Sequence, residues 1–378
     1  MKTKGKLKTP SAGRSVRYAV VGLGHIAQVA VLPAFRHARS NSQLVALVSD
    51  DPVKQRRLGD QYRVPETYSY EEYELCLRSG DVDAVYIALP NNLHREFAVR
   101  AARAGVHVLC EKPLAVTEED CEEIIRACAE NQVKLMTAYR LHFNRANLEA
   151  VKILKSGRIG EPRIFNSLFT MQVKEGNIRL KKELGGGTLY DIGIYCINAA
   201  RYLFRAEPIE VFAFSAKNDD ERFREVDEMT TAVLRFPDER LANFTSSFGA
   251  ADAAMYQVIG TKGTLCMDKP YEYAEEVELE LTVNGKAQRR TYARGDQFAP
   301  ELLYFSDCVL KDKEPEPSGI EGLIDVHIIR SLYKSAKTGL PIKLNQLSRR
   351  RRPNKRQEIT RPPVEKPEEI HAEAPTRD

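Results

Sequence analysis

The fold is indicated most directly by residues 16–27, which read VRYAVVGLGHIA. An apolar, β-type run comes first, and a helical pattern follows over residues 28–38. The junction has the form GxGxxA, in which the first glycine permits a tight turn, the second lets the backbone approach a pyrophosphate, and the alanine allows close helix packing. The sequence therefore predicts a dinucleotide site at a helix N-terminus. The residues expected to contact the nucleotide here are Gly22, Gly24, His25 and Ile26.

The second strand, over residues 43–48, ends where a residue for ribose recognition is expected. Asp50 could accept hydrogen bonds from a ribose 2′-hydroxyl, which favours NAD. Ser49 and a basic residue such as Lys54 could instead hold a 2′-phosphate, which favours NADP. Asp51 is expected to cap the helix that follows. The residues alone leave the choice of nucleotide open.

Two more strands end in polar residues that should lie at the same edge of the sheet. The run 84–89 is followed by PNNLH, and the run 104–110 by EKPL. In an open α/β sheet, ligands bind in the crevice outside the carboxyl ends of the strands, so these side chains should converge on one cleft. The alternatives are a surface lysine, a helix-capping asparagine and a first-turn surface histidine. The residues expected to face the cleft are Pro90, Asn91, His94, Glu111 and Lys112.

The pattern of the chain changes at residue 140. Residues 15–139 alternate β and α patterns, which predicts a Rossmann-type, doubly wound parallel sheet of the α/β class. Residues 140–345 contain successive strand-like runs joined by short turns, which predicts an α+β domain with an open, mainly antiparallel sheet. Residues 1–14 are expected to be a flexible basic leader, and residues 346–378 a disordered basic tail.

Composition limits the classes of partner. The 378 residues carry a net charge of +4, but residues 1–14 hold five basic residues and no acid, and residues 346–378 hold nine basic and six acidic residues. The middle of the chain is therefore slightly acidic, which disfavours a nucleic-acid-binding face. Seven scattered cysteines without metal-binding spacing predict reduced thiols, a cytoplasmic location and no metal centre. No apolar run is long enough to predict a membrane span.

A second candidate for chemistry lies in the helical pattern over residues 188–204, which follows three glycines at 185–187. Asp191 and Tyr195 are four residues apart, so in a helix both address the same point. A phenol with an unperturbed pKa of about 10 needs a nearby cation to act as a base near neutral pH. Lys112 is the natural source of that cation, and Tyr195 would then exchange a proton with a substrate hydroxyl. Without Lys112, a helix N-terminal acid and a core tyrosine are the simpler interpretations.

These motifs together resemble the Gfo/Idh/MocA family of nicotinamide-dependent oxidoreductases, and most of all its glucose–fructose oxidoreductase type. The resemblance spans about residues 15–345 and rests on the glycine loop, PNNLH at 90–94, AGVHVLCEKPLA at 104–115 and GGGTLYDIGIY at 185–195. It implies a nucleotide-binding domain followed by an open-sheet domain that often mediates oligomerisation. The family's catalytic residues fall on Lys112, Asp191 and Tyr195. Its substrate-pocket residues fall on Tyr139, Arg140 and the loop that begins at Arg179.

The sequence therefore predicts an NAD(P)-dependent oxidoreductase that transfers a hydride between a nicotinamide cofactor and a hydroxyl or carbonyl group of a carbohydrate, polyol or cyclitol. The alternatives are a non-catalytic, dinucleotide-sensing regulatory protein, and a glycosidase of the same family that recycles its cofactor. NADP-dependent members resemble this chain at Ser49 and Lys54, whereas Asp50 matches NAD-dependent ones, which gives NADP a slight preference. A small, sugar-like substrate and a homo-oligomer formed through the second sheet are also expected.

Overall fold

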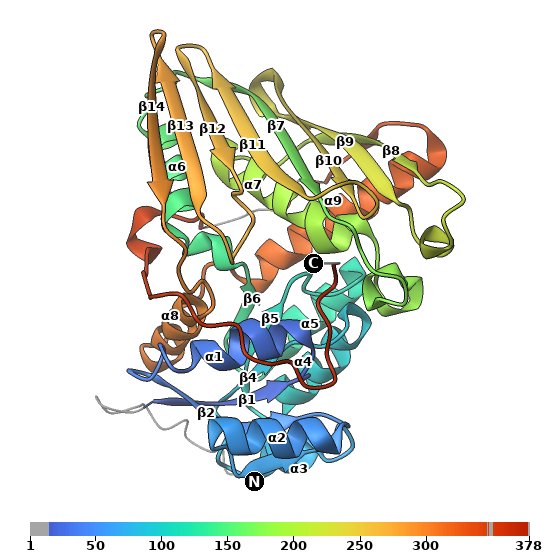
Figure 1. Ribbon diagram of the computed structural model, residues 1–378, viewed down its shortest axis with the longest axis vertical. Coiled ribbons are helices and arrows are strands. Elements are labelled where there is room, and N and C mark those ends of the chain that lie inside the picture. Colours follow the sequence, from blue (N-terminus) through green and yellow to red (C-terminus); the bar gives the residue numbers. More distant parts are fainter. Residues whose placement is uncertain (1–14, 346, 348–350, 377–378) are drawn as a thin grey trace.

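The computed structural model describes residues 15–345, 347 and 351–376, so the predicted leader at residues 1–14 lies outside the described residues. Within the described residues, the chain forms two sheets with helices packed beside them (Figure 1). A six-stranded sheet occupies the lower part of the view, and a nine-stranded sheet the upper part. The predicted fold class, a Rossmann-type sheet followed by an α+β domain, is confirmed.

The first sheet has the strand order β3-β2-β1-β4-β5-β6, and its strands pair in parallel. The order reverses between β1 and β4, which is where a doubly wound sheet opens a crevice for a ligand. Strand β4 is buried along its whole length, as expected for a parallel strand covered on both faces. The strands are β1 (Val16–Val21), β2 (Ser42–Val48), β3 (Glu66–Tyr68), β4 (Ala84–Ile87), β5 (His107–Glu111) and β6 (Leu135–Ala138).

Helices cover both faces of this sheet, and one of them comes from the far end of the chain. Helix α8 (Ala299–Leu310) follows all the long strands of the second sheet, yet it packs beside α1 on the first sheet (Figure 1). The Tyr18 hydroxyl lies 2.8 Å from Ser306 Oγ, and Asn41 Nδ2 donates to the Leu303 carbonyl at 2.9 Å. The first sheet therefore also carries a helix from outside the predicted residues 15–139. Its other helices are η1 (Ala27–Val31), α1 (Leu32–Ala34), α2 (Pro52–Tyr62), α3 (Tyr73–Arg78), α4 (His94–Arg103) and α5 (Glu118–Glu130).

The second sheet has the order β14-β13-β12-β11-β7-β10-β9-β8-β15. Its neighbours pair antiparallel, except that β7 and β10 run parallel to each other, which the succession of short turns did not indicate. The strands are β7 (Pro162–Thr170), β8 (Glu210–Ala216), β9 (Met229–Phe236), β10 (Arg240–Ser247), β11 (Ala253–Gly260), β12 (Gly263–Asp268), β13 (Val277–Val283), β14 (Lys286–Tyr292) and β15 (Ile342–Lys343). Helices α6 (Arg145–Lys155), α7 (Ile194–Phe204) and α9 (Gly319–Thr338) complete the domain.

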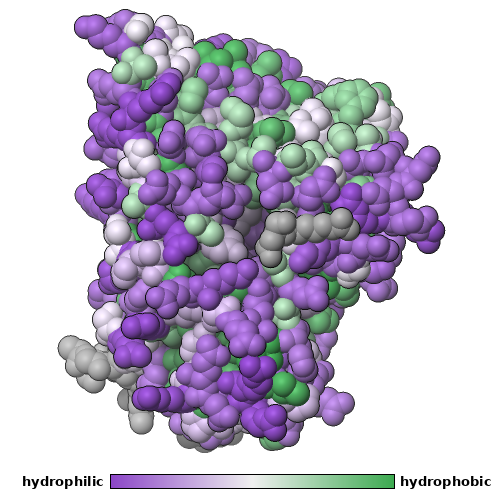
Figure 2. All heavy atoms as spheres, viewed as in Figure 1, coloured by the Kyte–Doolittle hydropathy of each residue, from purple (hydrophilic) through white to green (hydrophobic). Residues whose placement is uncertain are grey.

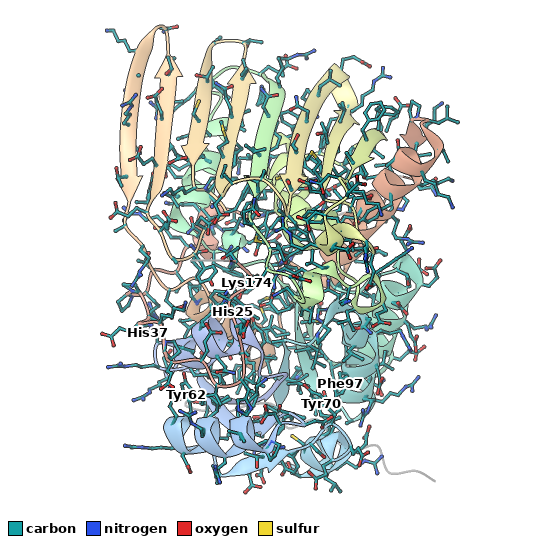
Figure 3. The ribbon with its side chains drawn as sticks, turned by 45° about the vertical axis from the view of Figure 1, so that its right-hand side comes forward. His25, His37, Tyr62, Tyr70, Phe97 and Lys174 are labelled. Atoms are coloured by element: carbon teal, nitrogen blue, oxygen red, sulfur yellow. The ribbon has the colours of Figure 1, made fainter. Side chains whose placement is uncertain are left out.

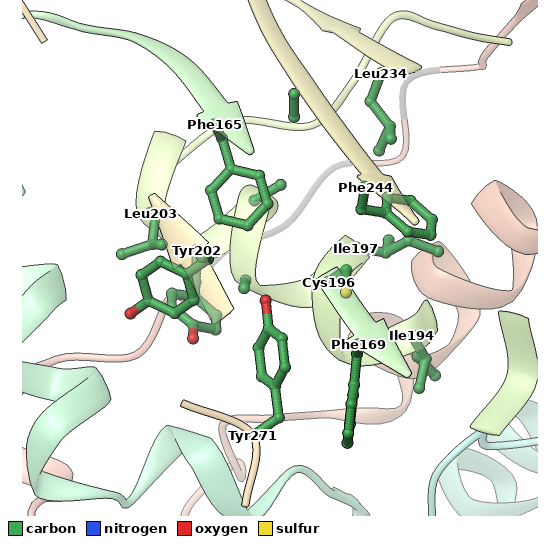
Figure 4. Close-up of a cluster of buried hydrophobic side chains, with 14 of the residues drawn as sticks. Phe165, Phe169, Ile194, Cys196, Ile197, Tyr202, Leu203, Leu234, Phe244 and Tyr271 are labelled. Carbon is green, nitrogen blue, oxygen red and sulfur yellow. The ribbon is translucent and has the colours of Figure 1, made fainter. Parts of the chain in front are cut away.

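The core of the second domain lies between its sheet and α7. Figure 4 shows two side chains of the sheet packed on α7, Phe244 beside Ile197 and Phe165 near Leu203, and it shows Tyr271 beside Phe169. The rings of Phe169 and Tyr271 stack with centroids 5.2 Å apart. Because strands alternate their side chains between two faces, the other face of the sheet is exposed. This packing fixes the start of α7 against the end of β7.

The C-terminal segment differs from its prediction. Residues 346–378 are expected to be disordered, but residues 351–376 lie against both domains. Arg352 forms an ion pair with Glu207 at 3.0 Å, and the Gln357 and Ile370 side chains are buried. The composition suggested disorder because this segment is polar and lacks aromatic residues. Its placement depends instead on hydrogen bonds and ion pairs with distant residues, which composition does not reveal.

Among the described residues, no helix has the length and apolar character that a membrane span requires.

Candidate active site

The carboxyl ends of β1, β2, β4 and β5 open into a cleft whose opposite wall belongs to the second domain. Its cavity volume of about 660 Å³ is within the range of about 300–1,000 Å³ typical of small-molecule and cofactor sites. In Figure 3, His25 lies at the upper edge of the nucleotide-binding domain, with Lys174 of the second domain above it. Most of the predicted site residues line this cleft: Gly22, Gly24, His25, Ile26, Ser49, Lys54, Pro90, Asn91, Glu111, Lys112, Arg140, Arg179, Asp191 and Tyr195.

The two glycines of this loop are needed for different reasons. Gly22 has a φ of +90°, and a Cβ added there would lie 2.6 Å from the Ala88 carbonyl oxygen. A Cβ added at Gly24 would meet no atom within 4 Å. The packing of the protein therefore requires the first glycine but not the second. The open space at Gly24, next to the start of a helix, fits a pyrophosphate that approaches the backbone.

At the end of β2, the structure separates the two candidates for ribose recognition. Ser49 and Lys54 line the cleft. Asp50 is exposed and lies outside the cleft lining, and its Oδ1 accepts a hydrogen bond from the Tyr70 backbone nitrogen at 2.7 Å. The prediction that Asp50 faces the nucleotide is therefore not met. Asp51 caps α2, as predicted, because its Oδ1 accepts from the backbone nitrogens of residues 53 and 54.

The polar residues after β4 have two different roles. Asn91 lines the cleft, and its Nδ2 donates to the Gly185 carbonyl at 2.9 Å, which joins the two walls. His94, predicted to contact the cofactor, is instead fully buried. Its Nδ1 lies 2.8 Å from the Pro113 carbonyl oxygen, and its Nε2 lies 2.9 Å from that of Leu89. Burial lowers the pKa of His94. The imidazole therefore packs between the loops after β4 and β5 and, as a neutral ring, donates its one N–H to one of these two carbonyl oxygens.

Lys112 and Asp191 meet across the cleft. Lys112 Nζ donates to the Asp191 backbone oxygen at 2.8 Å and to its Oδ1 at 3.2 Å, and Arg179 Nε donates to Asp191 Oδ2 at 2.6 Å. Burial alone would raise the pKa of Asp191, but the Arg179 guanidinium and the Lys112 ammonium outweigh it and lower that pKa to about 2. Asp191 is therefore a carboxylate at neutral pH that holds both cations in place.

Tyr195 lies close to two cations. Lys112 Nζ is 4.9 Å from the centroid of its ring, and the Arg140 guanidinium carbon is 5.0 Å from it. Burial alone would lower the pKa of Lys112, but negative charge on Tyr195, Asp191 and Glu111 outweighs it and raises that pKa. Two positively charged groups therefore lie within about 5 Å of the centroid of the phenol ring.

Asp191 belongs to a π-helical turn, η6 (Leu189–Gly193), that leads directly into α7. The sequence predicts an uninterrupted helix over residues 188–204, in which Asp191 and Tyr195 share one face. In the structure both residues line the cleft, although the turn between them is wider than an α-helical one. The nucleotide side has the same feature, because η1 after the glycine loop is also π-helical. Single π-turns of this kind are frequent at functional sites.

Tyr139 is the third predicted site residue that lies elsewhere. It is buried, and its hydroxyl donates to Asp325 Oδ2 at 2.6 Å. The chain turns at the end of β6 into η3 (Arg140–His142), so neighbouring side chains point in different directions. Arg140 enters the cleft, where it donates to the side-chain oxygen of Gln297 and to the Tyr271 carbonyl.

Part of the substrate wall was not predicted from the sequence. Tyr271, Glu272 and Tyr273, between β12 and β13, line the cleft, and so does Gln297. The Arg140 guanidinium carbon lies 5.4 Å from the ring centroid of Tyr273. The only available signal was the sequence PYEY between two alternating strand runs, where a short polar turn would be expected. Which wall this loop joins depends on the pairing of the whole sheet.

Known proteins share this architecture. A family model described as an oxidoreductase family with an NAD-binding Rossmann fold matches residues 16–139, and a model of the GFO/IDH/MocA C-terminal domain matches residues 147–266. The chain belongs to the Gfo/Idh/MocA oxidoreductase family. The predicted resemblance is thus confirmed, and the first sheet with its glycine loop is an NAD(P)-binding domain.

Relatives of this chain include sugar oxidoreductases. The D-xylose 1-dehydrogenase [NADP(+)] of Haloarcula marismortui is 32% identical over 337 residues, which are 87% of this chain and 93% of that enzyme. The crystal structure of aldose-aldose oxidoreductase from Caulobacter crescentus, complexed with glycerol, is 38% identical and has a TM-score of 0.84. The match covers 88% of this chain and all of that one.

A more distant relative was solved with a nucleotide. It is a 3-ketoreductase from Actinomadura kijaniata in complex with NADP and TDP-benzene, 28% identical, with a TM-score of 0.78 and coverage of 85% of this chain and 98% of that one. This Gfo/Idh/MocA protein is an NAD(P)-dependent oxidoreductase, as predicted. The comparisons do not support the alternatives, a dinucleotide sensor and a cofactor-recycling glycosidase.

Proposed function

We propose that this protein is an NADP-dependent oxidoreductase of aldose-type sugars. The observation that carries the proposal is that Lys112, Asp191 and Tyr195 meet in the same cleft as the glycine loop. A proton-transfer group and a dinucleotide site thus open into one cavity. Its substrate end combines aromatic rings with charged side chains, a lining suited to the apolar faces and hydroxyl groups of a sugar.

The roles of the chain's own residues follow from their contacts. Tyr195 exchanges a proton with the reacting oxygen of the sugar, and Lys112 and Arg140 stabilise the phenolate. Asp191 fixes the position of the Lys112 ammonium and is itself held by Arg179. When bound, the nicotinamide accepts or supplies the hydride. The other predicted contacts of the nucleotide, apart from Asp50 and His94, line the cleft beside this group.

The preference for NADP is supported by the end of β2. Lys54 lines the cleft and forms no ion pair with the described residues, so its charge is free to meet a phosphate. Ser49 lies beside it, while the Asp50 carboxylate is exposed and bonded to the backbone of residue 70. A carboxylate in contact with a ribose would repel a 2′-phosphate. Two of the relatives described above are named for, or were solved with, NADP.

The substrate class is supported by relatives that are named for sugars. The Haloarcula enzyme is named for D-xylose, and the Caulobacter enzyme for aldoses. In this chain, the position of Arg140, Arg179, Asp191 and Tyr195 in the cleft lining supports them as substrate contacts, whereas the burial of Tyr139 against Asp325 does not support that role. The loop at 271–273 adds two tyrosines and a glutamate to this wall.

The test begins with a titration of the protein with NADPH and, separately, NADH, followed by nicotinamide fluorescence. The chain contains no tryptophan, so the cofactor can be excited without interference. We expect saturable binding with a lower dissociation constant for NADPH. D-xylose and D-glucose are then assayed with NADP+, with their methyl glycosides as controls. NADPH should form with the free aldoses and not with the glycosides, in which the anomeric hydroxyl is blocked. Binding of NADPH without turnover of any aldose would contradict the substrate class.

The exposed face of the second sheet supports a homo-oligomer. Apolar side chains gather over this sheet in the upper half of Figure 2, and they include Phe214, 67% exposed, and Leu241, 47% exposed. Burial of such a patch against a second copy would stabilise a dimer. Sedimentation of the protein and of a Phe214→Glu, Leu241→Glu variant checks this, because only the variant should sediment as a monomer.

The seven cysteines are all free, which supports a reducing compartment and a cytoplasmic location.

A further inference from the structure

The entrance of the nucleotide cleft is crossed by a segment from the far end of the chain. Residues 363–376, which we name the C-terminal strap, run past α1 and rise to the second domain (Figure 1). Several of them line the same cleft as the glycine loop: Pro363, Val364, Lys366, Ala374, Pro375 and Thr376. The cavity volume of about 660 Å³ is present with the strap in place, so the strap borders the cleft rather than filling it.

The strap is attached to the glycine loop itself. Glu369 accepts a hydrogen bond from His25 Nδ1 at 2.7 Å, and the exposed fractions of these side chains are only 13% and 15%. Gln28 Nε2 donates to the carbonyl oxygens of both Leu23 and Ile370, each at 2.9 Å, and its Oε1 accepts from the Ile370 nitrogen at 2.7 Å. One buried glutamine thus joins the backbone of the loop to the backbone of the strap.

The strap also contacts the elements on either side of this loop. His371 Nδ1 lies 2.8 Å from Asp51 Oδ2, at the start of α2 and close to Ser49 and Lys54. At the other wall, the Lys174 backbone nitrogen donates to the Pro375 carbonyl oxygen at 2.8 Å, and Val173 and Thr376 form an antiparallel β-bridge. The strap is therefore anchored on both walls of the cleft. Its middle lies over the end of β2, where a Rossmann domain holds the adenosine ribose.

We propose that the C-terminal strap is part of the nucleotide site, and that it holds the adenosine end of the bound dinucleotide and slows its release. The inference rests on the proposed function, because it requires a dinucleotide in this cleft. A nucleotide between the loop and the strap leaves only when the contacts of Glu369 and Ile370 break. By linkage, a nucleotide that contacts the strap in this position must also stabilise the strap in this position.

The test uses the full chain with a Glu369→Gln, Ile370→Ala variant, which removes the charge opposite His25 and most of the one buried apolar side chain of the strap. The matched control is Glu365→Ala. Glu365 belongs to the same strap, is exposed, and forms no ion pair or hydrogen bond with the described residues. Hydrogen exchange over residues 363–376 reports whether the strap is bound to the cleft. The exchange rate should be low in the unmodified protein and in the control variant, lower still when NADPH is bound, and high in the double variant.

Release of the nucleotide is measured on protein loaded with NADPH and mixed with excess NADP+, by the loss of nicotinamide fluorescence. We expect release to be about tenfold faster in the double variant and unchanged in the control, since changes to a binding site act mainly on dissociation. Equal release from a double variant whose strap exchanges fast would overturn the inference and leave the proposed function intact. Fast exchange of the strap in the unmodified protein, with NADPH bound, would also overturn it. Failure of every form to bind NADPH would refute the proposed function itself.

Discussion

The nucleotide wall of the cleft is formed by short segments that each follow a parallel strand, whereas the substrate wall is assembled from unrelated elements. Equivalent places at the ends of β1, β2, β4 and β5 are occupied by residues 22–26, 49–54, 88–91 and 111–112. The opposite wall consists of a strand end, a π-turn, the loop between β12 and β13, and the residues just before α8. One wall therefore follows a single rule of the fold, and the other depends on how the second sheet pairs. The substitutions below test whether binding and chemistry divide between the walls in the same way.

The largest difference is expected between two lysines. Lys112→Met removes the cation between Asp191 and Tyr195, so kcat should fall about 10³-fold, while the dissociation constant of NADPH changes little. Lys54→Met removes a cation at the end of β2, so the dissociation constant should rise and kcat should remain. Steady-state kinetics and fluorescence titration of both variants measure the two effects. Equal losses of kcat in both variants would contradict the division of roles.

A smaller effect is expected from the two glycines of the nucleotide loop. Gly22→Ala places a Cβ against the Ala88 carbonyl at a positive φ, so the free energy of unfolding should fall by about 1–3 kcal/mol. Gly24→Ala meets no protein atom, so the fold should keep its stability while nucleotide binding weakens. Urea unfolding and NADPH titration of both variants check this. A stability loss in Gly24→Ala equal to that in Gly22→Ala would show that the space at Gly24 is not free.

The smallest effect is expected at the base of the substrate wall. Tyr139→Phe removes one hydrogen bond to Asp325, which keeps its contacts with Asn198 and Arg201, so the free energy of unfolding should fall by about 0.5–1.5 kcal/mol, with KM for the sugar unchanged. Arg140→Gln, one residue further, should instead raise KM, because Arg140 lines the cleft. Urea unfolding and substrate saturation curves separate the two outcomes. If Tyr139→Phe raised KM and left the free energy of unfolding unchanged, Tyr139 would have to contact the substrate after all.

Much of the nucleotide wall could be predicted because its rules are local. A strand, a GxGxxA turn and a helix occur within about twenty residues, and the positive φ of Gly22 follows from that turn alone. Local rules failed where a neighbour decides the direction of a side chain. Asp50 is held by the backbone of residue 70, and His94 by carbonyl groups from two different loops. Neither partner is adjacent in sequence, so spacing could not reveal them.

The substrate wall was predictable only where a helix fixed the spacing. Asp191 and Tyr195 were found because residues four apart share a helical face, and the π-turn preserves their common direction. Tyr139 lies outside the cleft lining, because side chains of consecutive residues at the end of a strand point to opposite sides. Arg140 therefore enters the cleft, whereas Tyr139 contacts Asp325. The loop at 271–273 gave no chemical signal, because its position depends on the pairing of β12 with β13. Contacts between segments distant in sequence therefore account for what the sequence did not reveal.

The measurement that tests the central claim most directly is a single turnover of Tyr195→Phe, with the aldose identified by the screen and saturating NADP+. The variant keeps the ring close to Lys112 and Arg140 but has no hydroxyl proton to exchange. We expect hydride transfer, followed by nicotinamide absorbance, to slow about 10²- to 10⁴-fold, with an unchanged NADPH dissociation constant. Hydride transfer at the rate of the unmodified protein would show that the proton passes through another group, and the proposed role of Tyr195 would be wrong.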